Sequence, residues 1–68
     1  MNKIKILRNT LNLSQAELAD KLEITVRQVQ RYERGTTDIP ISKIIQLADL
    51  FDVSIDYLVG RSDNPKRL

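Results

Sequence analysis

The chain has 68 residues and contains no cysteine and no histidine, which leaves room for one small domain and excludes a disulfide framework and an ordinary zinc site. The net charge is +2 but unevenly spread: residues 1–34 carry seven Lys/Arg against four Asp/Glu, a balance of +3, whereas residues 35–60 have a balance of −3 from one Lys against four Asp. No apolar run approaches the roughly 20 residues that span a bilayer, and we expect a cytoplasmic protein without a secretory signal or membrane contact.

Three helices are predicted in the basic half, and no stretch alternates apolar and polar residues as a strand would. The first covers about residues 2–11, with Ile4, Leu7 and Leu11 on one apolar stripe. The second begins after Ser14, because Glu17 follows three residues later. That is the spacing of a capping box, in which each side chain hydrogen-bonds the backbone N–H of the other residue.

The third helix starts at a second capping box, Thr25 with Gln28, and ends at Gly35, a residue suited to the left-handed conformation that closes helices. Val29 and Tyr32 are predicted to face the core. The opposite side is crowded with long hydrogen-bonding side chains. This exposed set consists of Arg27, Gln30, Arg31 and Arg34, with Val26 at its start and Gln28 at its edge.

The acidic half is predicted to hold two more helices. Pro40 fits the first turn of the fourth helix, because proline lacks the N–H that a helix start leaves unpaired. The broad buried face of that helix is predicted to comprise Ile41, Ile44, Ile45, Ala48 and Phe51. Ser54 is predicted to cap a last helix over residues 55–59. We therefore expect an all-α domain of five helices over residues 1–60 and a flexible polar tail over residues 61–68.

Only a few residues, around Glu23 to Thr25, separate the second helix from the third. Two short helices joined so tightly form a helix-turn-helix unit, whose second helix enters the major groove of DNA while the first crosses the backbone. Arginine can donate two hydrogen bonds to guanine, and glutamine can pair with adenine. An ordinary solvated face is the alternative interpretation of the same side chains, and the turn spacing favours DNA.

With these features the chain resembles the Cro/cI-type (XRE family) helix-turn-helix regulators, which have a lambda-repressor-like fold. The resemblance rests on the stretches LNLSQAELADKLEITVRQVQRYERG and IPISKIIQLADLFDVSIDYLVG and covers nearly all of residues 3–60. It implies a sequence-specific transcriptional regulator, expected to be a repressor, that binds an inverted-repeat operator in double-stranded DNA as a homodimer. It implies no cofactor, no metal and no small-molecule ligand.

The resemblance assigns roles by position. The base-reading positions are Val26, Arg27, Gln28 and Arg31. The positions implied to contact the DNA backbone are Gln15, Gln30, Arg34, Thr36 and Thr37. In the family, the glutamine that matches Gln15 also braces a side chain of the third helix, and the loop that matches the two threonines presents backbone N–H groups to phosphate. The alternatives are a polar helix start for Gln15 and a polar turn for the threonines.

Two further positions are implied to serve the fold. Arg8 and Glu33 match an ion pair that ties the first helix to the third, and removing one buried partner would cost about 3–5 kcal/mol. The sequence departs from the family at Glu23, where glycine is usual. A left-handed conformation there costs a non-glycine residue on the order of 1 kcal/mol, so either the strain is tolerated or the turn has another shape. Asn12, in the preceding turn, tolerates that geometry better.

An enzyme is not expected, because the chain has no His or Cys and its two glycines form no phosphate loop. The open alternative is a protein-interaction or antitoxin-like helical module in which DNA binding is secondary. Such a module would expose an apolar patch, for which the residues of the last helix, Tyr57, Leu58 and Val59, are the candidates. The preferred use of this patch is a homodimer interface.

Overall fold

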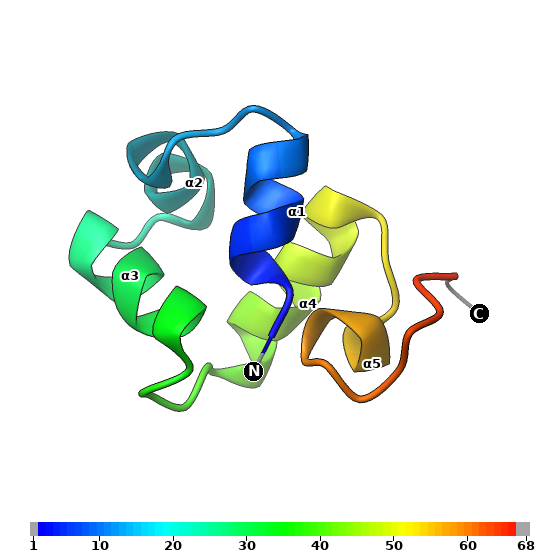
Figure 1. The fold of residues 1–68 in the computed structure, drawn as a ribbon. Helices are drawn as coiled ribbons and strands as arrows, with labels where there is room; N and C mark the ends of the chain where they lie inside the picture. The colour runs from blue at the N-terminus through cyan, green and yellow to red at the C-terminus, as the bar shows by residue number, and fades with distance from the viewer. Residues whose placement is uncertain (1, 67–68) are drawn as a thin grey trace.

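The computed structural model describes residues 2–66, which form five helices and, within that range, no strand (Figure 1). The helices are α1 (Ile4–Thr10), α2 (Gln15–Leu22), α3 (Val26–Arg34), α4 (Ile41–Phe51) and α5 (Ile55–Leu58). The predicted all-α, lambda-repressor-like architecture is confirmed. The first helix is shorter at both ends than predicted. Arg67 and Leu68 of the predicted tail lie outside the described residues.

Both predicted capping boxes are present, so α2 and α3 begin where the sequence indicates. The Ser14 Oγ accepts from the Glu17 N–H at 3.0 Å, and the Glu17 Oε1 accepts from the Ser14 N–H at 2.9 Å. Thr25 and Gln28 make the matching pair at 3.1 and 2.9 Å. The hydrogen bond from the Ser14 backbone, followed by that from its hydroxyl, holds the pKa of the exposed Glu17 carboxyl below its ordinary value.

The turn between α2 and α3 keeps a left-handed residue without glycine. Glu23 has φ 57° and ψ 43°, so this chain tolerates the strain and does not reshape the turn. The Ile24 N–H donates to the Ala19 carbonyl at 3.0 Å and satisfies one of the last carbonyls of α2. Asn12 also has φ 57°.

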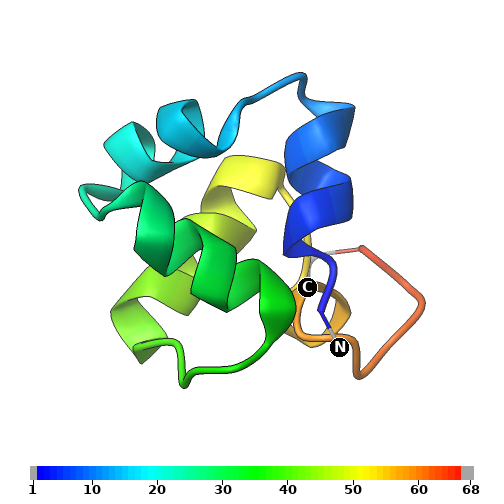
Figure 2. The same ribbon diagram turned by 60° about the vertical axis from the view of Figure 1, so that its left-hand side comes forward.

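α4 is the central support of the fold, since it contacts α1, α2 and α5 (Figure 2). α2 and α3 pack against each other on one side of the molecule, and α5 lies with the chain after it on the other. The Lys43 Nζ in α4 donates to the Leu22 carbonyl at 2.6 Å and so binds the end of α2. Within residues 2–66, every helix is too short or too polar to cross a lipid bilayer.

The core lies where the five helices meet. Its largest fully buried side chains are Ile4, Leu18, Leu22, Val29, Leu47 and Leu58. Beyond α5, the Ser54 N–H donates to the Pro65 carbonyl at 2.9 Å, and the Ser54 hydroxyl donates to the Asn64 carbonyl at 3.3 Å. The described part of the tail therefore lies against the start of α5, and its flexibility stays a prediction.

The predicted buried face of α4 is partly wrong. Ala48 and Phe51 are buried as predicted, and Ile44 packs against the core. Ile41 and Ile45, by contrast, are 67% and 46% exposed. Leu47 is buried although the prediction did not include it. The contacts of α4 with its neighbours cover a narrower stripe than the run of apolar residues suggests. Isoleucines outside that stripe have no helix to pack against.

Two smaller predictions also fail. Pro40 lies one residue before the first turn of α4, as its N-cap, where its carbonyl accepts from the Lys43 and Ile44 N–H groups. Leu11 lies beyond the end of α1 and is 46% exposed, because the chain turns away at Asn12 before a third apolar position can face the core.

Candidate nucleic-acid interface

α3 has two unlike sides. Val29 and Tyr32 are 0% and 5% exposed and hold the helix on the core, as predicted. Arg27 and Arg31 are exposed on the rest of its surface, and Val26 at its first turn is 38% exposed. The predicted base-reading side chains of α3 are therefore available to a partner, while the helix itself is anchored.

Gln28 is also exposed, but its side chain takes part in the helix start. Its Oε1 accepts from the Thr25 N–H at 2.9 Å. A bidentate pair with adenine uses both ends of a glutamine amide. Because one end of this amide is held at the capping box, the box limits the direction in which Gln28 can approach a base.

Arg8 and Glu33 form the ion pair that ties α1 to α3. The Arg8 Nε lies 2.5 Å from the Glu33 Oε2, and the two side chains are only 10% and 6% exposed. The Arg8 Nη1 also donates to the Leu13 carbonyl at 2.8 Å. The guanidinium therefore closes the turn before α2 and also holds α3 in place. Both contacts serve the fold.

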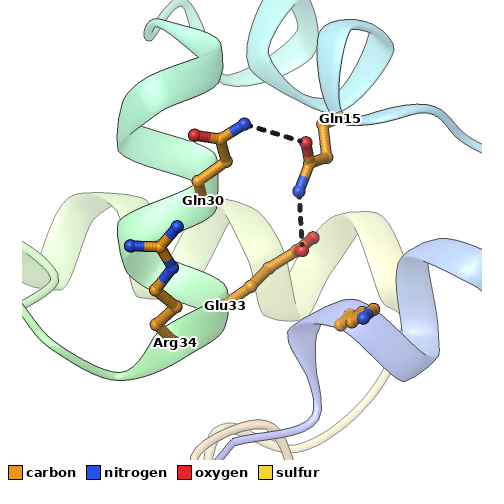
Figure 3. A pocket seen from close by; sticks show the side chains of 5 residues that line it. Gln15, Gln30, Glu33 and Arg34 are labelled. Carbon is orange, nitrogen blue, oxygen red and sulfur yellow. Dashed lines mark hydrogen bonds between the residues drawn. The ribbon is translucent and has the colours of Figure 1, made fainter.

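A chain of hydrogen bonds leads from this ion pair to the surface (Figure 3). The Gln15 Nε2 donates to the Glu33 Oε1 at 3.1 Å, and the Gln30 Nε2 donates to the Gln15 Oε1 at 3.3 Å. Gln15 thus braces α3 through two of its side chains. We call the four residues Arg8, Glu33, Gln15 and Gln30 the polar relay.

The relay borders an open pocket between α1, α2 and α3. Its lining residues are Lys5, Gln15, Gln30, Glu33 and Arg34. Sequence reasoning had placed Gln15, Gln30 and Arg34 near the DNA backbone, and the structure brings these three together. Lys5, which lies on the first helix and outside the helix-turn-helix unit, also lines the pocket and was not among the predicted residues.

The loop after α3 differs from what the family pattern implies. The Thr36 N–H donates to the Arg31 carbonyl at 3.3 Å, so it helps to close the end of α3 and does not point out toward a phosphate. Both Thr36 and Thr37 are exposed, and the hydroxyl of each stays available. Of the predicted contacts with the DNA backbone in this loop, the structure therefore argues only against the one from the Thr36 backbone N–H.

The predicted dimer surface needs one correction. Leu58 is 1% exposed and belongs to the core, because α5 turns this side chain toward the other helices. Tyr57 and Val59 are half-buried. The Lys3 Nζ lies 5.6 Å from the centre of the Tyr57 ring, a cation–π contact that covers part of the ring.

Comparison with known proteins agrees with this geometry. Residues 4–58 match the helix-turn-helix family. YobD of Bacillus subtilis (strain 168), an uncharacterized HTH-type transcriptional regulator, is 35% identical over 63 residues, which cover 93% of this chain and 56% of YobD. ImmR, an HTH-type transcriptional regulator of the same strain, is 32% identical over 65 residues, which cover 96% of this chain and 51% of ImmR.

A third relative is the cryptic phage CTXphi transcriptional repressor RstR of Vibrio cholerae. It is 33% identical over 54 residues, which cover 79% of this chain and 48% of RstR. The chain thus spans about half the length of the curated relatives it matches.

Proposed function

The chain belongs to the XRE-type helix-turn-helix family of transcriptional regulators, and from this premise we propose that it binds specific sequences in double-stranded DNA. The observation that carries the proposal is the exposed side of α3, where Arg27 and Arg31 stand clear while Val29 and Tyr32 anchor the helix. The major groove admits one α-helix, and an anchored helix can present its side chains there in a fixed register. The family match and the relatives named as transcriptional regulators indicate a DNA-binding regulator and not an enzyme.

The proposed roles of the individual side chains are those that the family resemblance implies. The proposed base-reading residues are Val26, Arg27, Gln28 and Arg31. A bidentate arginine–guanine pair discriminates by about 1–3 kcal/mol, and valine can contact a thymine methyl group. The proposed backbone contacts are Gln15, Gln30, Arg34 and the hydroxyls of Thr36 and Thr37. Contacts with phosphate release counterions, so binding should weaken steeply with salt.

We extend the proposal to a cytoplasmic repressor that acts as a homodimer. One α3 offers few base contacts, and two copies on an inverted repeat would place their helices in successive major grooves, about 34–36 Å apart. Bound protein would then cover DNA that polymerase needs. Of the predicted dimer surface Tyr57 and Val59 remain, and Ile55 on the same helix is 41% exposed. Sedimentation should find two copies on one operator, and one copy or a tight trimer would contradict the dimer.

The test of sequence-specific binding is selection from a random pool of duplex DNA at about 0.15 M salt, followed by sequencing. The expected product is an inverted repeat with half-sites one helical turn apart. Without enrichment, and with retention that vanishes as salt rises, only phosphate attraction would remain and the proposal would fail.

A matched pair of arginine variants then maps α3 onto the operator. Arg31→Ala should weaken binding by about 1–3 kcal/mol and relax the preference at one operator position, because it removes a bidentate base contact. Arg61→Ala removes the same charge from an exposed residue beyond α5 and should keep the operator preference of the parent. Selection repeated with each variant measures both effects. An unchanged preference in Arg31→Ala would contradict the proposed docking.

One observation favours a second candidate function, the protein-interaction module. Ile41 and Ile45 lie four residues apart on α4 and are 67% and 46% exposed, and this apolar strip differs from an ordinary polar helix surface. If the selection enriches no sequence, a protein partner that covers this strip becomes the leading explanation. Binding of such a partner should then be abolished by Ile41→Lys, whereas the Arg31→Ala variant should still bind it.

A further inference from the structure

The side chain of Gln28, one of the proposed base-reading residues, is already engaged within the protein. Its amide oxygen is held by Thr25 at the start of α3. We infer that Gln28 contacts its base as a hydrogen-bond donor only, and that the operator base facing it is guanine or thymine and not adenine. The inference rests on the proposed DNA-binding function and deepens it by naming the class of base that this residue recognises.

Two donors on Thr25 fix the direction of this amide. The Thr25 N–H donates to the Gln28 Oε1 at 2.9 Å, and the Thr25 hydroxyl donates to the same oxygen at 3.4 Å. An amide oxygen has two lone pairs, so Thr25 engages both. A backbone N–H can only donate, and an amide nitrogen in that place would set one donor against another. The oxygen of Gln28 therefore faces Thr25, and its Nε2 faces away from it.

The capping box of α2 shows the same requirement with a different side chain. There the Ser14 N–H donates to the Glu17 Oε1, also at 2.9 Å. An ionised glutamate accepts hydrogen bonds and donates none. The third residue of either helix thus turns an oxygen toward its N-cap residue. The group that remains on the outside is what differs, since Gln28 has an NH2 group there and Glu17 has a second carboxylate oxygen.

The outward nitrogen of Gln28 is available to DNA. Within residues 2–66, the hydrogen bonds of Gln28 at the capping box use its oxygen and its backbone N–H, and they leave both N–H groups of the Nε2 unused. Gln28 is exposed and lies in the first turn of α3. The N-terminal residues of a recognition helix are the ones that contact base edges. Gln28 therefore offers a base two donors and no acceptor.

This pattern selects between two classes of base. In the major groove guanine presents the acceptors O6 and N7 and thymine presents the acceptor O4, whereas adenine and cytosine each present an amino group, which donates. An outward NH2 group meets acceptors on the keto bases, guanine and thymine, and meets a donor on the amino bases, adenine and cytosine. The usual bidentate pair of glutamine with adenine needs the amide oxygen, which Thr25 holds.

Release of the oxygen for adenine would be unfavourable on DNA. Gln28 would gain a hydrogen bond from the adenine amino group and lose the one from the Thr25 N–H. In the free protein water can replace the lost partner, but DNA that covers the start of α3 would exclude water. A backbone N–H that is buried without a partner is costly. A keto base avoids this exchange, because the capping box stays closed while the Nε2 donates.

The operator position that faces Gln28 is found by repeating the selection from random duplex DNA with Gln28→Ala. One position should lose its preference, because this variant has no side-chain amide. Every base pair contains one keto base and one amino base, so the preferred pair alone does not reveal which of the two bases Gln28 contacts.

Base analogues that lack one major-groove group make that distinction. In each strand in turn, the base at this position is replaced by an analogue without its keto oxygen or without its amino group. Affinities of the parent and Gln28→Ala are then measured by fluorescence anisotropy. Removal of the keto oxygen should weaken the parent about fivefold more than Gln28→Ala, the low end for a good base contact. Removal of the amino group should affect both proteins equally, and a greater effect on the parent would overturn the inference.

Gln28→Glu provides the converse test. It should keep the capping box, as Glu17 does in α2, and present an oxygen in place of the outward NH2 group. Selection with this variant should place an amino base where the parent has a keto base. Gln46→Glu makes the same change of charge at an exposed residue of α4 and should keep the preference of the parent. The parental preference in Gln28→Glu would overturn the inference.

Failure of the inference and failure of the proposed function give different results. A parent that enriches no sequence would overturn both. An enriched operator at which Gln28→Ala relaxes no position would overturn the inference and leave the proposed function intact. Thermal unfolding shows that the variants keep the fold, and Gln28→Glu should match the parent, since a carboxylate also suits the positive end of the helix dipole.

Discussion

α3 and α4 pack on the same core but expose opposite chemistry. α3 exposes Arg27 and Arg31, whereas α4 exposes Ile41 and Ile45. α3 begins at a capping box, and α4 begins after Pro40 without any side-chain cap. Each of these helices buries its own set of core side chains and lies against α1.

The difference teaches that a helix of this chain folds with large apolar side chains among its exposed polar ones. α4 is a complete helix although two large isoleucines stand in solvent. Solvation alone therefore gives no reason for three arginines and two glutamines on α3. The polarity of α3 fits a partner, and the polar relay adds a structural role on the side that faces α1 and α2.

The largest effect should come from the side of α3 that faces α1. Glu33→Ala should lower the free energy of unfolding by about 3–5 kcal/mol, because it leaves the nearly buried Arg8 guanidinium without its carboxylate. Urea denaturation measures the loss. Arg34→Ala, the exposed neighbour on the same helix, should stay within about 0.5 kcal/mol of the parent. An equal loss of unfolding free energy in both variants would mean that the Arg8–Glu33 ion pair stabilises the fold no more than an exposed arginine does.

The next effect should separate the two sides of α4. Leu47→Ala should destabilise by about 2–5 kcal/mol, because Leu47 is 0% exposed and its removal leaves a cavity. Ile45→Ala, two residues away and 46% exposed, should change stability by about 0.5 kcal/mol. Thermal and urea unfolding of the two variants give the comparison. Equal losses would show that the isoleucine strip of α4 is covered in solution.

The smallest effect should distinguish the two helix starts. Thr25→Ala should cost about 1 kcal/mol of stability, because it leaves the Gln28 N–H at the start of α3 without its cap. Ser42→Ala removes a hydroxyl from the first turn of α4, where no side chain caps the helix, and should stay within about 0.5 kcal/mol. Urea unfolding of the two variants measures both losses of stability. A larger loss in Ser42→Ala than in Thr25→Ala would mean that Ser42, and not Thr25, caps its helix.

The starts of α2 and α3 were predicted correctly, because capping is a local property. Ser14 with Glu17 and Thr25 with Gln28 lie three residues apart, so their hydrogen bonds depend on the helix and on nothing distant. Burial on α4 was predicted only in part and failed at Ile41 and Ile45, because residue type does not reveal how wide a stripe the neighbouring helices cover. Leu58 was misjudged for the converse reason, since α5 turns it inward.

The candidate site was predicted in part. The exposed arginines of α3 follow from the spacing of the buried Val29 and Tyr32 along one helix. The hydrogen-bond partners of Gln15 and the pocket beside it could not be predicted from spacing along the chain. They depend on how α1, α2 and α3 are placed relative to one another.

The hydrogen bond from Lys43 to the Leu22 carbonyl affects whether the helix-turn-helix unit can be moved to another protein. This ammonium group lies at the negative end of the α2 dipole and comes from α4, outside the two helices that form the motif. Arg8 supports the other end of the pair from α1. The helix-turn-helix unit is therefore not self-contained, and a segment grafted from residues 14–35 into another scaffold would lack both supports. If the proposed function holds, binding specificity would instead be transferred by exchanging only the exposed residues of α3 in a host that keeps both supports.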